Sequence, residues 1–155
     1  MTYTYFHNFP IGEVGVAETD GAISHVYFDD TTNKPKNAEV KETPLIKRAE
    51  VQLREYFAGK RTEFDLPLAL EGTEFQLKVW KALQDIPFGI VRSYKDIAVA
   101  VGNVKACRAV GMANNRNPIS IIVPCHRVVG HNGKLVGYGG GLPTKEYLLE
   151  LEKRS

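Results

Sequence analysis

The chain has 155 residues, of which 43% are hydrophobic and 25% charged, with a formal net charge of +2. These values are typical of an ordinary globular protein, and no apolar run is long enough to cross a membrane. The N-terminus has neither a basic region nor a long apolar core, so we expect no secretory signal and a cytoplasmic location. The two cysteines, Cys107 and Cys125, are expected to stay free, and they are too few for a Cys-rich zinc site, so we expect no metal.

The charge is distributed unevenly along the chain. Residues 1–68 hold 8 basic and 11 acidic side chains, whereas residues 69–155 hold 12 basic and 7 acidic ones. Between residues 86 and 134 there are seven basic side chains and one acidic one. This local excess indicates a surface that meets phosphate, although a solvated basic face is a common alternative. The seven are Arg92, Lys95, Lys105, Arg108, Arg116, Arg127 and Lys134.

The first half of the chain predicts a small sheet. Alternation over residues 2–6 is typical of an edge strand. Asp20 and Gly21, between apolar stretches at 13–18 and 22–28, predict a two-residue hairpin. The polar stretch that follows, up to residue 42, is expected to be a loop.

One helix should pack on this sheet. Thr43 is a suitable N-cap, with Pro44 in the first turn, and Gly59 is placed to end the helix. Residues 63–68 are expected to form one more short strand. No residue of this half suggests chemistry, so we assign it a supporting role. The predicted apolar face of the helix consists of Leu45, Ile46, Ala49, Leu53, Tyr56 and Phe57.

A linker near residues 66–73 is predicted to separate a domain at 1–68 from a second at 69–155. After it, Thr73 and Gln76 have the spacing of a capping box and predict the start of a helix.

Two short helices joined near Gly102 then match a helix-turn-helix pattern. Ser93 is placed to cap the first, and Asn103 to cap the second, from about 104 to 114. The second helix is rich in small residues and projects Arg108. A slim helix with one arginine suits the minor groove, although small residues also serve tight helix packing.

The last part of the chain predicts a turn, a loop and a helix. Asn132 and Gly133 predict a tight turn, and a hairpin there would resemble the wing of a winged helix. The glycine-rich run 138–141 lacks the spacing of a P-loop, and its backbone could approach a flat ligand closely. Pro143 should begin the last helix, with Glu152 near its end.

The strongest chemical signal is a thiol beside an imidazole, Cys125 and His126, between two apolar β-branched runs. A cysteine here is a nucleophile if a base removes its proton, but a lone cysteine in an apolar run is more often a small buried hydrophobe. Adjacent residues on a regular strand face opposite sides, so a turn is needed to bring the two side chains together. Glu152 is the best candidate to fix the imidazole tautomer, with a solvated helix end as its alternative.

Several motifs of the C-terminal half belong together. They are Asn117-Pro118, Ile122-Val123-Pro124-Cys125-His126-Arg127-Val128, Ser93-Tyr94, Arg108-Ala109-Val110-Gly111, Tyr138-Gly139-Gly140-Gly141-Leu142 and 145–152. Together they resemble one family, the O6-alkylguanine-DNA alkyltransferases. The similarity covers the whole C-terminal half with specific motifs, and the N-terminal third only in length and pattern.

The resemblance implies an α/β (α+β) protein. Its N-terminal domain would be ribonuclease-H-like and its C-terminal domain would resemble a winged helix-turn-helix. It also implies single-use repair, in which the alkyl group of O6-alkylguanine, and of O4-alkylthymine, moves irreversibly to a protein cysteine. The implied partner is double-stranded DNA that carries the lesion, bound by a monomer without a cofactor.

The resemblance also assigns roles to residues. Cys125 would accept the alkyl group, His126 would act through water as its base, and Glu152 would hold His126. Asn117 would brace the turn that carries the cysteine. On the DNA side, Tyr94 would help rotate the nucleotide, Arg108 would enter the stack as a finger, and the Val128 carbonyl would meet the exocyclic amine of the base. The loop over the flipped guanine would consist of Tyr138, Gly139 and Gly140.

Two other functions remain open at this point. One is a winged-helix regulator that binds DNA or a lesion without transfer, in which Cys125 is structural. The other is a cysteine hydrolase built on Cys125, His126 and Glu152, for which no oxyanion-hole signature is evident beyond the glycine-rich loop.

Overall fold

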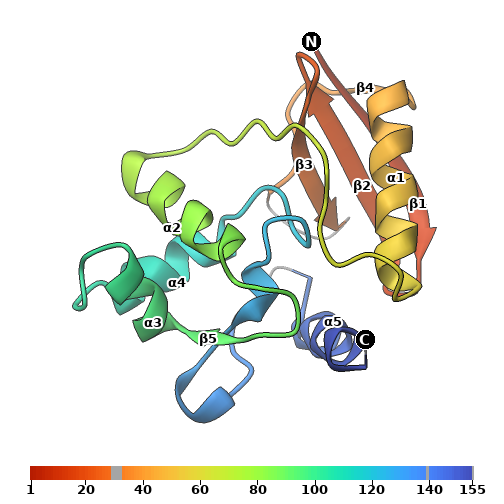
Figure 1. Cartoon of the computed structure of the whole chain (residues 1–155). Helices are drawn as coiled ribbons and strands as arrows, with labels where there is room; N and C mark the ends of the chain where they lie inside the picture. Colours follow the sequence, from red (N-terminus) through yellow and green to blue (C-terminus); the bar gives the residue numbers. More distant parts are fainter. Residues whose placement is uncertain (29–32, 139, 155) are drawn as a thin grey trace.

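The computed structural model describes residues 1–28, 33–138 and 140–154. A small sheet with one helix along its face makes up the N-terminal half (Figure 1). A group of helices and irregular segments makes up the C-terminal half, beside the sheet. The chain is thus a mixed α/β protein, as the sequence predicts.

The sheet has four strands in the order β3-β2-β1-β4. The first three are antiparallel neighbours, and β4 pairs with β1 in parallel. The predicted hairpin is confirmed, because Asp20 and Gly21 both have positive φ, 50° and 87°, as a tight two-residue turn requires. The strands are β1 (Thr2–Phe9), β2 (Gly12–Thr19), β3 (Ala22–Phe28) and β4 (Glu39–Val40).

Helix α1 (Pro44–Phe57) packs against β1, β2 and β3, as the sequence predicts. The Thr43 hydroxyl oxygen accepts a hydrogen bond from the Ile46 amide at 3.1 Å, which satisfies one of the free donors of the first turn. After the helix, Gly59 takes a φ of 75°, a conformation that glycine adopts without steric cost. The fully buried face of α1 includes Ile46, Ala49, Leu53 and Tyr56.

The prediction of a strand over 63–68 is wrong. The described structure there has only an isolated bridge between Leu68 and Ile23. The outer edge of β3 is shared by two segments, because Val26 bonds in the same way to the backbone around Pro118 and Ser120. Neither segment has room to form a full strand, and their shared edge ties the C-terminal half to the sheet.

The C-terminal half is built around a helix-turn-helix. Thr73 and Ser93 both form capping boxes, at the starts of α2 and α3. The Trp80 indole donates to the Ala113 carbonyl at 2.9 Å, which fixes α2 against α4. The elements are α2 (Glu74–Gln84), β5 (Arg92–Ser93), α3 (Tyr94–Ala100), α4 (Cys107–Asn115), η1 (Cys125–Arg127), β6 (Val128–Val129), η2 (His131–Gly133) and α5 (Leu142–Lys153).

Two local predictions in this half need correction. Helix α4 begins at Cys107 instead of 104, because the Asn103 side chain accepts from the Lys105 amide in a turn and does not cap the helix. The predicted turn exists, with Asn132 at a φ of 63°, but it is one 3-10 turn and no wing hairpin. Strand β6 pairs with β5 in parallel instead. A single backbone bond from Gly130 to Lys134 cannot hold two strands together.

Within the described ranges, none of the helices combines the length and apolarity that a membrane span needs.

Candidate active site

The cysteine and histidine occupy one turn in the middle of the C-terminal half. The 3-10 turn η1 follows Val123 and leads into Val128, and both valines are fully buried. Strand β6 then pairs with β5, so both ends of the turn are anchored. The turn supplies the departure from strand geometry that two adjacent, cooperating side chains need.

The segment before the turn is strained and braced. Ile121 is 1% exposed and has a φ of 71°, which is a costly conformation for a β-branched residue. The buried Asn117 side chain spans this segment, donating to the Val123 carbonyl at 2.7 Å and accepting from the Ile119 amide at 3.0 Å. Its amide therefore holds in place the backbone that leads to Cys125.

His126 and Glu152 form a buried pair. The His126 Nε2 lies 2.6 Å from the Glu152 Oε2, and neither side chain is more than 1% exposed. An ionised carboxylate only accepts, so Nε2 carries the proton in the neutral ring. The Nδ1 of His126 is buried and has no hydrogen-bond partner within the described ranges. This nitrogen therefore keeps a free lone pair that can take a proton.

The electrostatics of the pair favour a neutral His126 imidazole beside an ionised Glu152 carboxylate. Burial raises the pKa of Glu152, but hydrogen bonds from His126, Arg127 and Tyr56 outweigh it and hold the pKa well below the usual range. Burial lowers the pKa of His126, and the neighbouring Glu152 only partly offsets this. At neutral pH the carboxylate is therefore charged and the imidazole is free to accept a proton.

The Cys125 thiol needs a base before it can react. Burial raises the pKa of Cys125, whereas the Asn117 side chain and the positive charge of Lys145 lower it in part. The cysteine is 5% exposed, so its sulfur is not open to bulk water. A neutral thiol in such a place becomes a nucleophile only when a nearby group removes its proton.

Three further residues belong to this site, although the sequence did not place them in it. Arg127 donates to Glu152 from Nε at 2.8 Å and from Nη2 at 3.1 Å. The Tyr56 hydroxyl reaches the same carboxylate from α1 at 2.6 Å. Lys145 is fully buried, donates to the Val136 carbonyl at 2.9 Å, and has its pKa lowered by burial to about 8.

The role of Arg127 is a correction to the predicted phosphate-binding surface. Its side chain is 8% exposed, and its guanidinium group is hydrogen-bonded to Glu152 and to the Ile86 carbonyl, so it does not face DNA. The other six basic residues of that stretch are exposed. A signal for Tyr56 was present, because a tyrosine on a predicted buried helix face needs a partner for its hydroxyl.

Arg108 and Tyr94 lie on the helix-turn-helix. Arg108 is exposed in the first turn of α4, and Tyr94 begins α3. The Tyr94 hydroxyl donates to the Val136 carbonyl at 3.1 Å, and its ring lies beside Gly111 of α4. Burial raises the pKa of Tyr94, and the neighbouring Cys125 raises it further. Tyr94 therefore stands between the exposed helix and the cysteine.

The glycine-rich loop packs on the sheet instead of leaving an open platform. The Tyr138 and Phe28 rings lie 5.9 Å apart. A Cβ at Gly140 would come within 2.8 Å of the Phe28 ring, so glycine is required there for close packing. Gly139, which the resemblance places in this loop, lies outside the described residues.

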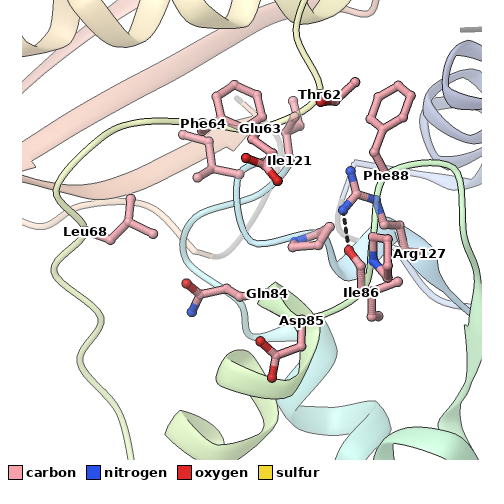
Figure 2. A pocket seen from close by; sticks show the side chains of 13 residues that line it. Thr62, Glu63, Phe64, Leu68, Gln84, Asp85, Ile86, Phe88, Ile121 and Arg127 are labelled. Carbon is pink, nitrogen blue, oxygen red and sulfur yellow. Dashed lines mark hydrogen bonds between the residues drawn. The ribbon is translucent and has the colours of Figure 1, made fainter.

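A cleft of about 400 Å³ lies between the segment 62–68 and the C-terminal half, as Figure 2 shows. Its lining includes Phe64, Phe88 and Arg127, but not Cys125, His126 or Tyr138. Arg127 stands at its wall with Nη1 bonded to the Ile86 carbonyl at 2.7 Å. The cleft thus reaches the charge network of the site but not the sulfur, and it is not the place where an alkyl group meets Cys125.

One group of side chains in the N-terminal half has ligand-type atoms close together. His7, Glu42 and Glu50 have such atoms within 4.8 Å of one another. Lys47 and Arg54 both bond to Glu50, so its carboxylate is already neutralised by two cations. We interpret this group as an ion-pair network that joins β1 to α1.

The fold and site define a class of protein. A buried cysteine, next to a histidine that is held by a carboxylate, lies behind an exposed helix of a helix-turn-helix that carries Arg108. This combination is typical of a DNA-binding protein with a nucleophilic cysteine.

Comparison with known proteins identifies the family. Residues 1–70 match the family described as "6-O-methylguanine DNA methyltransferase, ribonuclease-like domain", and residues 74–154 match its "DNA binding domain". The chain belongs to the methylated-DNA–protein-cysteine methyltransferases. Its fold is the one the resemblance implies, a ribonuclease-like sheet and helix followed by a helical DNA-binding domain.

Close relatives cover nearly the whole chain. The methylated-DNA–protein-cysteine methyltransferase of Methanosarcina acetivorans is 50% identical over 98% of both chains. The constitutive enzyme of Bacillus subtilis is 48% identical over 100% of this chain and 98% of its own. A crystal structure of Mycobacterium tuberculosis OGT in complex with DNA has a TM-score of 0.92 and 46% identity, and the match covers 98% of this chain and 93% of that one.

Proposed function

We propose that the protein repairs O6-alkylguanine, and O4-alkylthymine, in double-stranded DNA by moving the alkyl group to Cys125 once per molecule. It would act as a monomer in the cytoplasm without a cofactor. Residues 1–68 would support the site, and residues 69–155 would bind DNA and accept the alkyl group. The observation that carries the proposal is the buried relay formed by Cys125, His126 and Glu152. In it the Nδ1 of His126 has no hydrogen-bond partner among the described residues, while its Nε2 lies 2.6 Å from the Glu152 carboxylate.

The reaction is a displacement at carbon. His126 takes the thiol proton, directly or through a water, and Glu152 stabilises the imidazolium. The Cys125 sulfur attacks the alkyl carbon, so a C–S bond forms while the C–O6 bond breaks. The electron pair of that bond stays on the guanine, which takes up a proton and is restored as the normal base within the DNA. A thioether is not hydrolysed under cellular conditions, so no step regenerates the thiol.

The DNA side of the proposal follows from where the target atom lies. The O6 position is inside the stack, so the nucleotide must rotate out, at a cost of about a few kcal/mol that a poorly paired lesion reduces. Exposed Arg108 is planar and always charged, and it can fill the space that the base leaves. Tyr94 bonds to the Val136 carbonyl and lies beside Gly111 of α4, and from there it would help to rotate the nucleotide.

The closed site adds a step. Cys125 is 5% exposed, and the Tyr138 hydroxyl above the relay is buried. A flipped guanine therefore enters only after Tyr138 and Gly140 move away from Phe28. The Val128 carbonyl, at the start of β6, would then meet the exocyclic amine of the base.

Intact-protein mass spectrometry after incubation with an O6-methylguanine duplex tests this function. We expect a gain of one methylene mass that stops at one equivalent and maps to the peptide with Cys125. Cys125→Ala should retain DNA binding and gain no mass, whereas Cys107→Ser should behave as the parent protein. If Cys125→Ala still gained the mass, Cys107 would be the acceptor. Bound duplex without any mass gain would instead indicate a lesion-binding regulator.

A further inference from the structure

The N-terminal half contributes a side chain to the relay. Tyr56 on α1 is fully buried, and its hydroxyl lies 2.6 Å from the Glu152 Oε2, across 96 residues of sequence. The rings of Phe57, Phe64 and Phe88 surround the Tyr56 ring at centroid distances of 5.4, 5.6 and 6.1 Å. Aromatic packing on several sides holds the ring, so the hydroxyl has little freedom to leave the carboxylate.

Tyr56 shares one oxygen atom with the base. The Glu152 Oε2 accepts from Tyr56 and from His126, both at 2.6 Å, and from Arg127 at 3.1 Å. The other oxygen, Oε1, accepts from Arg127 and from the Gly89 amide. Bulk water does not compete for these hydrogen bonds, since the Glu152 side chain is 1% exposed.

The direction of the Tyr56 hydrogen bond is fixed. Burial raises the pKa of Tyr56 far above its usual value, and the charge of Glu152 raises it further. The phenol therefore stays protonated and can only donate to the carboxylate. A donor on the same oxygen withdraws part of the negative charge that would otherwise stabilise a protonated His126.

We propose that Tyr56 is a positioning residue that aligns Glu152 with His126 and moderates how strongly His126 holds a proton. The N-terminal domain then sets the pH at which Cys125 becomes reactive, in addition to supporting the fold. This inference rests on the proposed alkyl transfer to Cys125, and it adds a residue from outside the DNA-binding domain to the control of that step.

The direct test is Tyr56→Phe, which removes one oxygen and keeps the ring in its aromatic surroundings. Without the phenol, more charge on Oε2 is available to His126, so the imidazolium–thiolate state forms more readily. His126 then keeps its proton up to a higher pH, so we expect the midpoint of the pH profile for transfer from O6-benzylguanine to move to higher pH, by about half a unit to one unit. Above the midpoint, where His126 is a free and stronger base, transfer should be about three- to tenfold faster than in the parent protein.

Tyr27→Phe is the matched control. Tyr27 is also a buried tyrosine of the N-terminal half, and its hydroxyl lies 2.6 Å from the Thr4 Oγ1, away from the relay. This variant should lower the melting temperature without moving the midpoint. If Tyr56→Phe also lowers only the melting temperature, or moves the midpoint to lower pH, the proposed role is wrong.

A second variant keeps the proposal testable if Tyr56→Phe folds poorly. Replacing Tyr56 with 3,5-difluorotyrosine retains the hydroxyl but makes it a stronger donor, so His126 holds its proton less strongly and the midpoint should move to lower pH. A midpoint that stays in place would overturn the inference. If the parent protein transfers no alkyl group at any pH, the proposed function is wrong. If it transfers the group but the midpoint does not shift in the Tyr56 variants, only the proposed role of Tyr56 is wrong.

Discussion

Replacing Arg127 with methionine removes the main counter-charge of a buried carboxylate. Arg127 donates two hydrogen bonds to Glu152, at 2.8 and 3.1 Å, and a third to the Ile86 carbonyl at 2.7 Å. Methionine is similar in length and fills much of the same space, so the change is mainly electrostatic. Removing one partner of a buried ion pair costs about 3–5 kcal/mol, because the other charge is left without compensation. Against a typical domain stability of about 5–15 kcal/mol, this loss is large.

The loss should depend on pH in a defined direction. Glu152 has a lowered pKa in the folded protein, so the stability it contributes is present above the ordinary carboxyl pKa of 4.5 and is lost as pH falls through the lowered value. In Arg127→Met the pKa of Glu152 rises, and protonation of Glu152 or of His126 relieves the uncompensated charge. The difference between parent and variant should therefore be largest near pH 7 and smaller near pH 4.

Urea unfolding at the two pH values measures this difference. Arg61→Met is a suitable control, because Arg61 pairs with Glu55 at 2.9 Å on the surface, with 28% and 42% of the side chains exposed. Such a pair contributes about 0–1 kcal/mol. A cost for Arg127→Met below about 1 kcal/mol at pH 7, or an equal cost at both pH values, would refute the assignment of Arg127 to the buried charge network.

Two further predictions concern the reaction. Arg108→Ala should slow repair of a duplex O6-methylguanine more than reaction with free O6-benzylguanine, because only the duplex needs its stack filled, and equal slowing in the two assays would remove the finger role. Lys145→Met should raise the pKa of Cys125 by removing a nearby positive charge, and slow transfer at pH 7 by up to about tenfold. A pH profile of transfer in a Cys107→Ser background measures this shift, and an unchanged midpoint would mean that Lys145 serves only to hold the Val136 carbonyl.

The local signals in the sequence were accurate where they depend on neighbouring residues. The hairpin at Asp20-Gly21 and the caps at Thr43, Thr73 and Ser93 were predicted and are present. Each is a contact within about four positions, whose geometry residue type alone largely determines. The cysteine and histidine were singled out for the same reason, since they are adjacent in the chain.

The errors occurred where distant segments compete. Residues 63–68 have a strand-like pattern, but the edge of β3 that they would need is shared with the segment around Pro118. Arg127 was counted as part of a basic surface, since charge counting cannot tell a buried cation from an exposed one. The structure places it at Glu152, 25 residues away.

The sequence by itself determined the family, the order of the main elements, and the thiol and imidazole at the centre of the site, because short motifs and local spacing carry that information. Only the tertiary structure decided how many donors meet at Glu152. Tyr56 comes from the N-terminal half, 96 residues before the carboxylate it binds, and Arg127 and Gly89 come from two other segments. These contacts arise because a buried carboxylate needs its hydrogen-bonding capacity filled, and the fold brings the nearest available donors to it regardless of their place in the chain.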